Sequence, residues 1–176
     1  MKLSTLYTTV PDYIEFGWVT APNTAGQSVS VDTITTLTLD TEVADTGSLV
    51  SAPTANVFTL PAGTYYYEAH TRIRTTGSNA TSFVFALYNT SDSAYVSRSG
   101  LASNATLRDN GSQPQSTTVC PQLSGQFVIA ASKSFDLRLL VDGNTVIVDN
   151  GSSSATMSDS TASADQRTTI KLWKLK

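Results

Sequence analysis

The stretch that decides the fold is VFTLPAGTYYYEAHTRIR, residues 57–74. It contains two runs rich in aromatic and β-branched residues, 57–60 and 64–74, which is the composition of β-strands. The Pro-Ala-Gly sequence at 61–63 is a turn signal between them. Successive side chains of a strand point to opposite faces, so the longer run presents one face that is predicted to lie in a hydrophobic core. The members of this face are Tyr65, Tyr67, Ala69, Thr71 and Ile73.

The opposite face of the longer run is not a simple solvent-exposed surface. It begins with the aromatic Tyr66 and continues with Glu68, His70 and Arg72, which could satisfy one another or contact a neighbouring chain. The last strand of the chain has the same ambiguity, because Trp173 and Leu175 lie on the face opposite its other apolar side chains. Both faces of these strands therefore need cover, and a symmetric oligomer would supply it.

Turn signals such as Asp-Gly and Asn-Gly recur along the rest of the chain and divide it into strand-length pieces. None of these pieces keeps a 3.6-residue period, whereas several alternate apolar and polar residues. The predicted strands are 13–19, 28–39, 57–60, 64–74, 82–88, 115–120, 125–130, 134–141, 145–148 and 168–175. The core faces among them include Ile14, Phe16 and Trp18; Phe83, Phe85 and Leu87; and Phe135, Leu137, Leu139 and Val141, with Asp136, Arg138 and Asp142 pointing the other way. The pattern predicts an all-β sandwich or barrel.

Polar segments separate some of these strands. Residues 21–27, 97–113 and 151–166 are predicted to be loops, and the last of them is either a binding loop or a mobile surface connection. Residues 1–12 are too polar to form a core, so they are an arm that docks elsewhere or simply a tail. The expected organisation is an N-terminal arm, 1–12, followed by one domain, 13–176.

The composition supports an all-β domain. The chain has 176 residues, 10 Gly, 6 Pro and 1 Cys, a size at which one core grows efficiently without disulfides or metals. It contains 23 Ser and 27 Thr against 3 Glu and 5 Lys. Hydroxyl residues favour strands, turns and caps, and the straight-chain helix formers are scarce, so an all-α fold is not expected.

The charge of the chain limits its partners. A net charge of −3 and an isoelectric point near 4.9 argue against nucleic acid or an anionic membrane as a partner. The N-terminus lacks the apolar core of a signal peptide, and no apolar run approaches the ~20 residues of a membrane-spanning helix. The sequence predicts synthesis in the cytoplasm and no membrane span.

Residues with catalytic or metal-binding chemistry are scarce. His70 is the single histidine, and Glu68 shares its face, but no nucleophile motif such as Gly-x-Ser-x-Gly completes a triad. A hydrogen-bonded or interfacial histidine is therefore favoured over a catalytic one, and the protein is not predicted to be an enzyme. No metal-ligand spacing or cofactor motif is present, and Cys120 is predicted to be a buried, unreactive thiol.

Four segments resemble a known family of trimeric jelly-roll domains. The run VFTLPAGTYYYEA at 57–69 is similar to the F-x-L-P-A-G-T-Y entry into a central strand of domains related to the tumour necrosis factor and complement globular-head folds, which recur in bacteriophage virion proteins. ALYNTSD at 86–92, LSGQFVI at 123–129 and TIKLWKL at 169–175 resemble the later strands of such domains in the expected order.

The resemblance implies an antiparallel jelly-roll β-sandwich that forms a homotrimer. The face left unassigned to the core, Tyr66, Glu68, His70, Trp173 and Leu175, is the one that such a trimer would bury. Typical trimers of this family are more apolar there, and this chain departs from them at Glu68 and His70.

The resemblance also implies a role in a virion. The chain has no heptads, collagen-like repeat or β-helical repeat, so a capsid decoration, or cement, protein bound to the major capsid protein at the capsid surface is preferred over a fibre tip. The alternative is a receptor-binding module that contacts host-surface carbohydrate through the loops 97–112 and 151–166. A hydrolase is a third possibility, retained only because His70 and Glu68 share a face.

Overall fold

The computed structural model describes residues 10–20, 25–75, 81–98, 118–143, 145–148 and 165–175. These residues form strands and connecting turns without any helix, so none of them belongs to a helix that could span a membrane. The strands are β1 (Asp12–Thr20), β2 (Gln27–Val29), β3 (Thr35–Thr36), β4 (Thr41–Asp45), β5 (Phe58–Leu60), β6 (Gly63–Thr71), β7 (Ile73–Thr75), β8 (Ser82–Asn89), β9 (Ala94–Arg98), β10 (Thr118–Val119), β11 (Gln122–Ile129), β12 (Lys133–Asp142), β13 (Val146–Val148) and β14 (Asp165–Leu175). The expected all-β class is confirmed.

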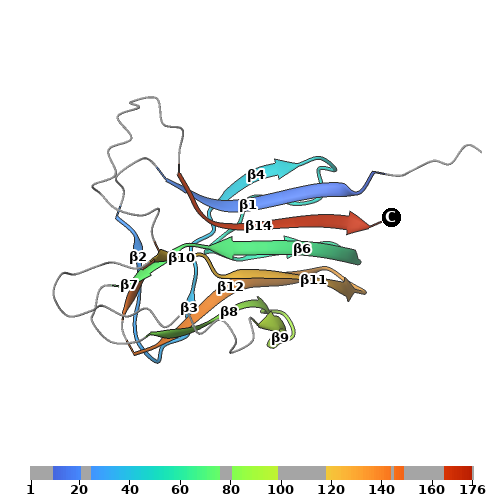
Figure 1. The fold of residues 1–176 in the computed structure, drawn as a ribbon. Helices are drawn as coiled ribbons and strands as arrows, with labels where there is room; N and C mark the ends of the chain where they lie inside the picture. Colours follow the sequence, from blue (N-terminus) through green and yellow to red (C-terminus); the bar gives the residue numbers. More distant parts are fainter. Residues whose placement is uncertain are drawn as a thin grey trace, which may run out of the picture.

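Two larger sheets pack face to face, and a smaller one extends them at one end (Figure 1). We call the sheet with the order β11-β6-β14-β1-β4 sheet A and the sheet with the order β3-β12-β8-β9 sheet C, to which β5 adds on β12. The small sheet has the order β10-β7-β13-β2. The paired strands are antiparallel, as expected of a jelly-roll sandwich.

The 57–74 stretch links the two large sheets. Its first strand, β5, pairs with β12 of sheet C, whereas its second strand, β6, lies between β11 and β14 in the middle of sheet A. The turn at Pro61 therefore carries the chain across the sandwich, and the Tyr65 hydroxyl fixes it by donating a hydrogen bond to the Pro61 carbonyl at 2.8 Å. The 57–74 stretch therefore supplies one strand to each of the two large sheets.

The core lies between sheets A and C. All core faces expected from the alternation are buried, including those of β1, β6, β8 and β12. Aromatic rings tie the sheets together, because Phe58 lies 5.0 Å from Phe16 of sheet A and 5.8 Å from Phe135 of sheet C, measured between ring centroids. Phe127 of β11 joins the same cluster at 5.3 Å from Phe135.

Some predicted strand boundaries were wrong. The run 28–39 is not one strand, because Asp32 adopts a left-handed φ of 55° and donates its N–H to Val141 instead of continuing a ladder. The run 64–74 divides at Arg72 into β6 and β7, which belong to different sheets. The short strands β4 and β9 were missed, since their exposed residues do not give a clear alternation of apolar and polar side chains.

Other sequence expectations fall on residues outside the described ranges. These include most of the arm at 1–12, most of the loops 97–113 and 151–166, and residues 115–117 of a predicted strand. Cys120 is described, and the prediction that it is buried was wrong. It is exposed in the short connection between β10 and β11.

The outer face of sheet C is covered by its own side chains. Asp136 points away from the core as predicted, yet it is only 3% exposed. Arg138 covers it through a bidentate ion pair, with N–O distances of 2.8 and 3.1 Å. The guanidinium carbon of Arg138 lies 3.3 Å from the ring centroid of Tyr88, which packs edge-on against Tyr95. Asp136, Arg138 and Tyr88 are therefore engaged with one another.

The turn between Thr54 and Val57 carries backbone strain that a substitution can relieve. Ala55 and Asn56 have φ values of 50° and 68°, as in a two-residue turn of the primed type, closed by two backbone hydrogen bonds. Ala55→Gly is expected to stabilise the fold by about 0.5–1 kcal/mol, since relief of left-handed strain exceeds the entropy cost of glycine. Urea denaturation measures the change. Ala62→Gly, at an exposed residue outside the left-handed region, should destabilise the fold, and equal effects at both positions would contradict the argument.

Candidate interaction surface

The outer face of sheet A, on the side away from the core, carries aromatic side chains in one row across three strands. The register places Trp173 of β14 opposite Tyr13 of β1 and opposite Tyr66 of β6. Its ring centroid lies 5.4 Å from that of Tyr13 and 5.6 Å from that of Tyr66. We call these three residues the aromatic row. Each ring is in part open to solvent, and Tyr66 is 37% exposed.

A charged row lies two residues further along the same strands. The register places Lys171 between Glu15 of β1 and Glu68 of β6. Each carboxylate accepts a hydrogen bond from the tyrosine of its own strand: Tyr13 donates to Glu15, and Tyr66 donates to Glu68 at 3.0 Å. These three residues, the charged row, carry a formal charge of −1 at neutral pH.

The tyrosine hydroxyls are held in their neutral form by this arrangement. The pKa of Tyr13 is raised by burial and by its hydrogen bond to Glu15, and the pKa of Tyr66 is raised first by its hydrogen bond to Glu68. A protonated tyrosine can donate to a carboxylate, whereas a tyrosinate would repel it. The aromatic and charged rows are therefore held together as one unit.

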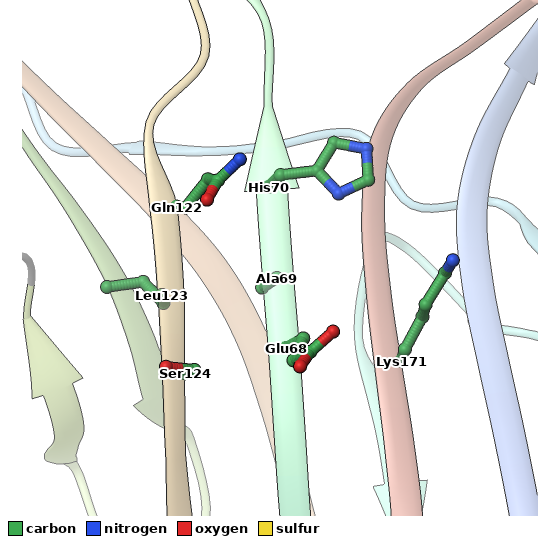
Figure 2. Close-up of a pocket in the computed structure, with 7 residues that line it drawn as sticks. All are labelled: Glu68, Ala69, His70, Gln122, Leu123, Ser124 and Lys171. Carbon is green, nitrogen blue, oxygen red and sulfur yellow. The ribbon is translucent and has the colours of Figure 1, made fainter.

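His70 lies on the same face two residues beyond Glu68, on the side of the charged row away from the aromatic row. The register places it between Gln122 of β11 and Thr169 of β14. A hollow of about 300 Å³ opens beside it, lined by residues of β6, β11 and β14 (Figure 2). His70 is half-buried, and its pKa is lowered by burial and by the positive charge of Lys171, while Glu15 acts in the opposite direction. The imidazole is accordingly neutral at pH 7.

The opposite end of the face is apolar. Val128 of β11 and Leu175 of β14 lie on either side of Thr64 of β6 in the register. They are 71% and 37% exposed, values that are high for large aliphatic side chains. The outer face of sheet A therefore changes along the strands from apolar, through aromatic and charged, to polar at His70.

The structure brings all five residues of the predicted interface onto this one face: Tyr66, Glu68, His70, Trp173 and Leu175. The sequence reasoning missed Tyr13, Glu15, Lys171 and Val128. The alternation of residues 13–19 already placed Tyr13 and Glu15 opposite the core, so that signal was present. Strand order and register, which set them beside Trp173 and Lys171, could not be derived from the alternation.

No contact among the described residues supports a catalytic role for His70. Within the described ranges, no hydrogen bond joins His70 to Glu68 or to Ser124, and Glu68 is instead bonded to Tyr66. A general base needs to be oriented by such a contact and to reach a nucleophile. Among these same residues, no cluster of three or more His, Cys, Asp and Glu side chains is arranged to hold a metal ion.

Comparison with known proteins identifies the fold. The sequence matches no known family, and no curated protein is significantly similar to it. The structure of Eiger TNF from S. frugiperda superposes with a TM-score of 0.54 at 11% identity, covering 94% of this chain and 94% of that one. Murine APRIL at pH 5.0 gives a TM-score of 0.51 at 10% identity, covering 94% of this chain and 99% of that one.

A third structure, the PRD1 vertex protein, covers 96% of this chain and 99% of its own at 12% identity, with a TM-score of 0.44 that is too low to establish a common fold. The first two similarities, together with the antiparallel two-sheet sandwich, show that the chain has the jelly-roll fold of the tumour necrosis factor-like domains.

Proposed function

We propose that the protein is a virion structural protein that forms a homotrimer through the outer face of sheet A and decorates a capsid. The observation that carries the proposal is the aromatic row, which is partly open to solvent on this face beside the exposed Val128 and Leu175. Contiguous exposed apolar and aromatic side chains mark interaction surfaces, and tyrosine and tryptophan are the residues that contribute most to binding.

The contrast between the two outer faces supports this choice of surface. On sheet C, Arg138 pairs with Asp136 and lies over the ring of Tyr88, and Tyr88 packs against Tyr95, which is 37% exposed. On sheet A the aromatic row has no covering layer among the described residues. A second copy of the chain packed on sheet A would bury the aromatic row and leave the outer face of sheet C exposed to solvent.

A closed trimer is the assembly that the sequence resemblance implies, and the fold is compatible with it. A homotrimer suits positions of local three-fold symmetry on a capsid lattice, because its symmetry lets each subunit make the same contact. In this position it would bind the major capsid protein through surfaces outside its own interface and bridge neighbouring capsomers. Its work is then mechanical and uses neither a cofactor nor a catalytic residue.

The location of the protein in purified particles tests the proposal. Heads and tails are separated, and the copies of the protein per particle are counted by quantitative mass spectrometry. We expect stoichiometric copies on heads, and we expect heads that lack the protein to release their DNA at lower temperature. Copies confined to tails, or binding of the isolated protein to host glycans with none on heads, would refute capsid decoration.

A further inference from the structure

We propose that mild acid dissociates the homotrimer and that His70 is the group responsible. The inference rests on the proposed assembly through the outer face of sheet A and adds its regulation. His70 is the single histidine of the chain, and no other side chain has an ordinary pKa between about 5 and 8. Protonation of His70 is therefore the side-chain titration that could change the assembly in that pH range.

The position of His70 makes its protonation costly in the assembly. It lies on the same face as the aromatic row, two residues beyond Glu68 on β6, beside the hollow of Figure 2. It is half-buried in the single chain already, so a copy packed on this face would remove more water from it. Burial of an imidazolium without a counter-charge is unfavourable.

The charges around His70 do not supply that counter-charge. On β14, Lys171 repels a proton on His70, whereas Glu15 on β1 attracts it. On its own chain segment, Glu68 of β6 lies two residues before His70, and Arg72 follows directly after the end of β6. The neighbours on β11, Gln122 and Ser124, are uncharged. Both carboxylates of the charged row already accept hydrogen bonds from tyrosines, so they are held toward the aromatic row.

The sign of the effect follows from linkage. Burial and Lys171 lower the pKa of His70 in the single chain, and the further burial in a trimer lowers it again. The trimer then binds fewer protons than its free subunits. Assembly is complete above the pKa of the free subunit and weakens as the pH falls below it, which places the transition below the ordinary value of about 6.5. With one proton per subunit, the association constant falls by up to about 10³ for each pH unit.

Sedimentation equilibrium at micromolar concentration tests this at about pH 8 and about pH 5.5, a range that spans the titration of histidine and stays above that of most carboxylates. The unmodified chain is compared with His70→Gln, which keeps a polar side chain and cannot be protonated. We expect the unmodified chain to be a trimer at the higher pH and a monomer at the lower, and His70→Gln to be a trimer at both. Circular dichroism at each pH verifies that the chains stay folded, and His70→Asn repeats the test if His70→Gln does not fold.

Each remaining outcome overturns a distinct claim. A trimer of the unmodified chain at both pH values overturns the acid switch and leaves the assembly intact. Dissociation of His70→Gln at low pH assigns the switch to other groups and overturns the role of His70. Monomers of both chains at about pH 8 overturn the proposed homotrimer itself, and the switch with it.

Discussion

Replacement of Trp173 by glutamate is expected to leave the protein folded and monomeric. Trp173 is the centre of the aromatic row, where it contacts Tyr13 and Tyr66, and it is not part of the buried core. A glutamate there would stand next to the charged row and add a third carboxylate to Glu15 and Glu68. In a trimer this charge would be buried without a partner in every subunit.

The expected loss of affinity is large. Removal of a central aromatic residue from an interface costs about 2 kcal/mol or more, so three subunits together lose about 6 kcal/mol, or ~10⁴-fold in the association constant. Light scattering on a sizing column at micromolar concentration measures the mass. Tyr95→Glu is the matched control, because Tyr95 is 37% exposed like Tyr66 but lies on the outer face of sheet C. A trimer of Trp173→Glu, or monomers of both variants, would count against the proposed interface.

The sequence predicted the core better than the sheets. Alternation assigned Ile14 and Phe16, or Leu137 and Leu139, to the interior, because burial of one face is a local property of a strand. The same alternation placed Trp173 and Tyr66 on the strand faces opposite the core. The fold class followed from the same local signals and from the resemblance of four short segments.

The cross-strand partners could not be predicted in this way. Tyr13 is separated from Trp173 by most of the chain, and their pairing depends on strand order, which alternation does not encode. The burial of Asp136 was missed for a related reason, since it depends on Arg138 folding back over Tyr88. The break at Arg72 arises because β6 and β7 pair with different neighbours, a property of the whole sandwich.

Replacement of Phe58 by alanine is expected to destabilise the fold by about 3–5 kcal/mol, the usual cost of a phenylalanine deleted from a core. Phe58 is buried between the sheets, and its ring contacts Phe16 on one side and Phe135 on the other. It also follows directly on the strained turn and precedes the crossing at Pro61, so the cavity would open where the two sheets are joined. Neighbouring strands are tied there by hydrogen bonds and cannot collapse into the space.

Urea denaturation followed by tryptophan fluorescence measures this loss, with the protein concentration held constant because assembly adds to apparent stability. The Trp173→Glu background removes that contribution if it is monomeric, as expected. Phe58→Leu keeps most of the volume and should cost less than about 2 kcal/mol, whereas Val43→Ala, on the exposed edge strand β4, should change stability by no more than about 0.5 kcal/mol. If Phe58→Ala were no more costly than Val43→Ala, the aromatic contact between sheets A and C would not be what holds the sandwich together.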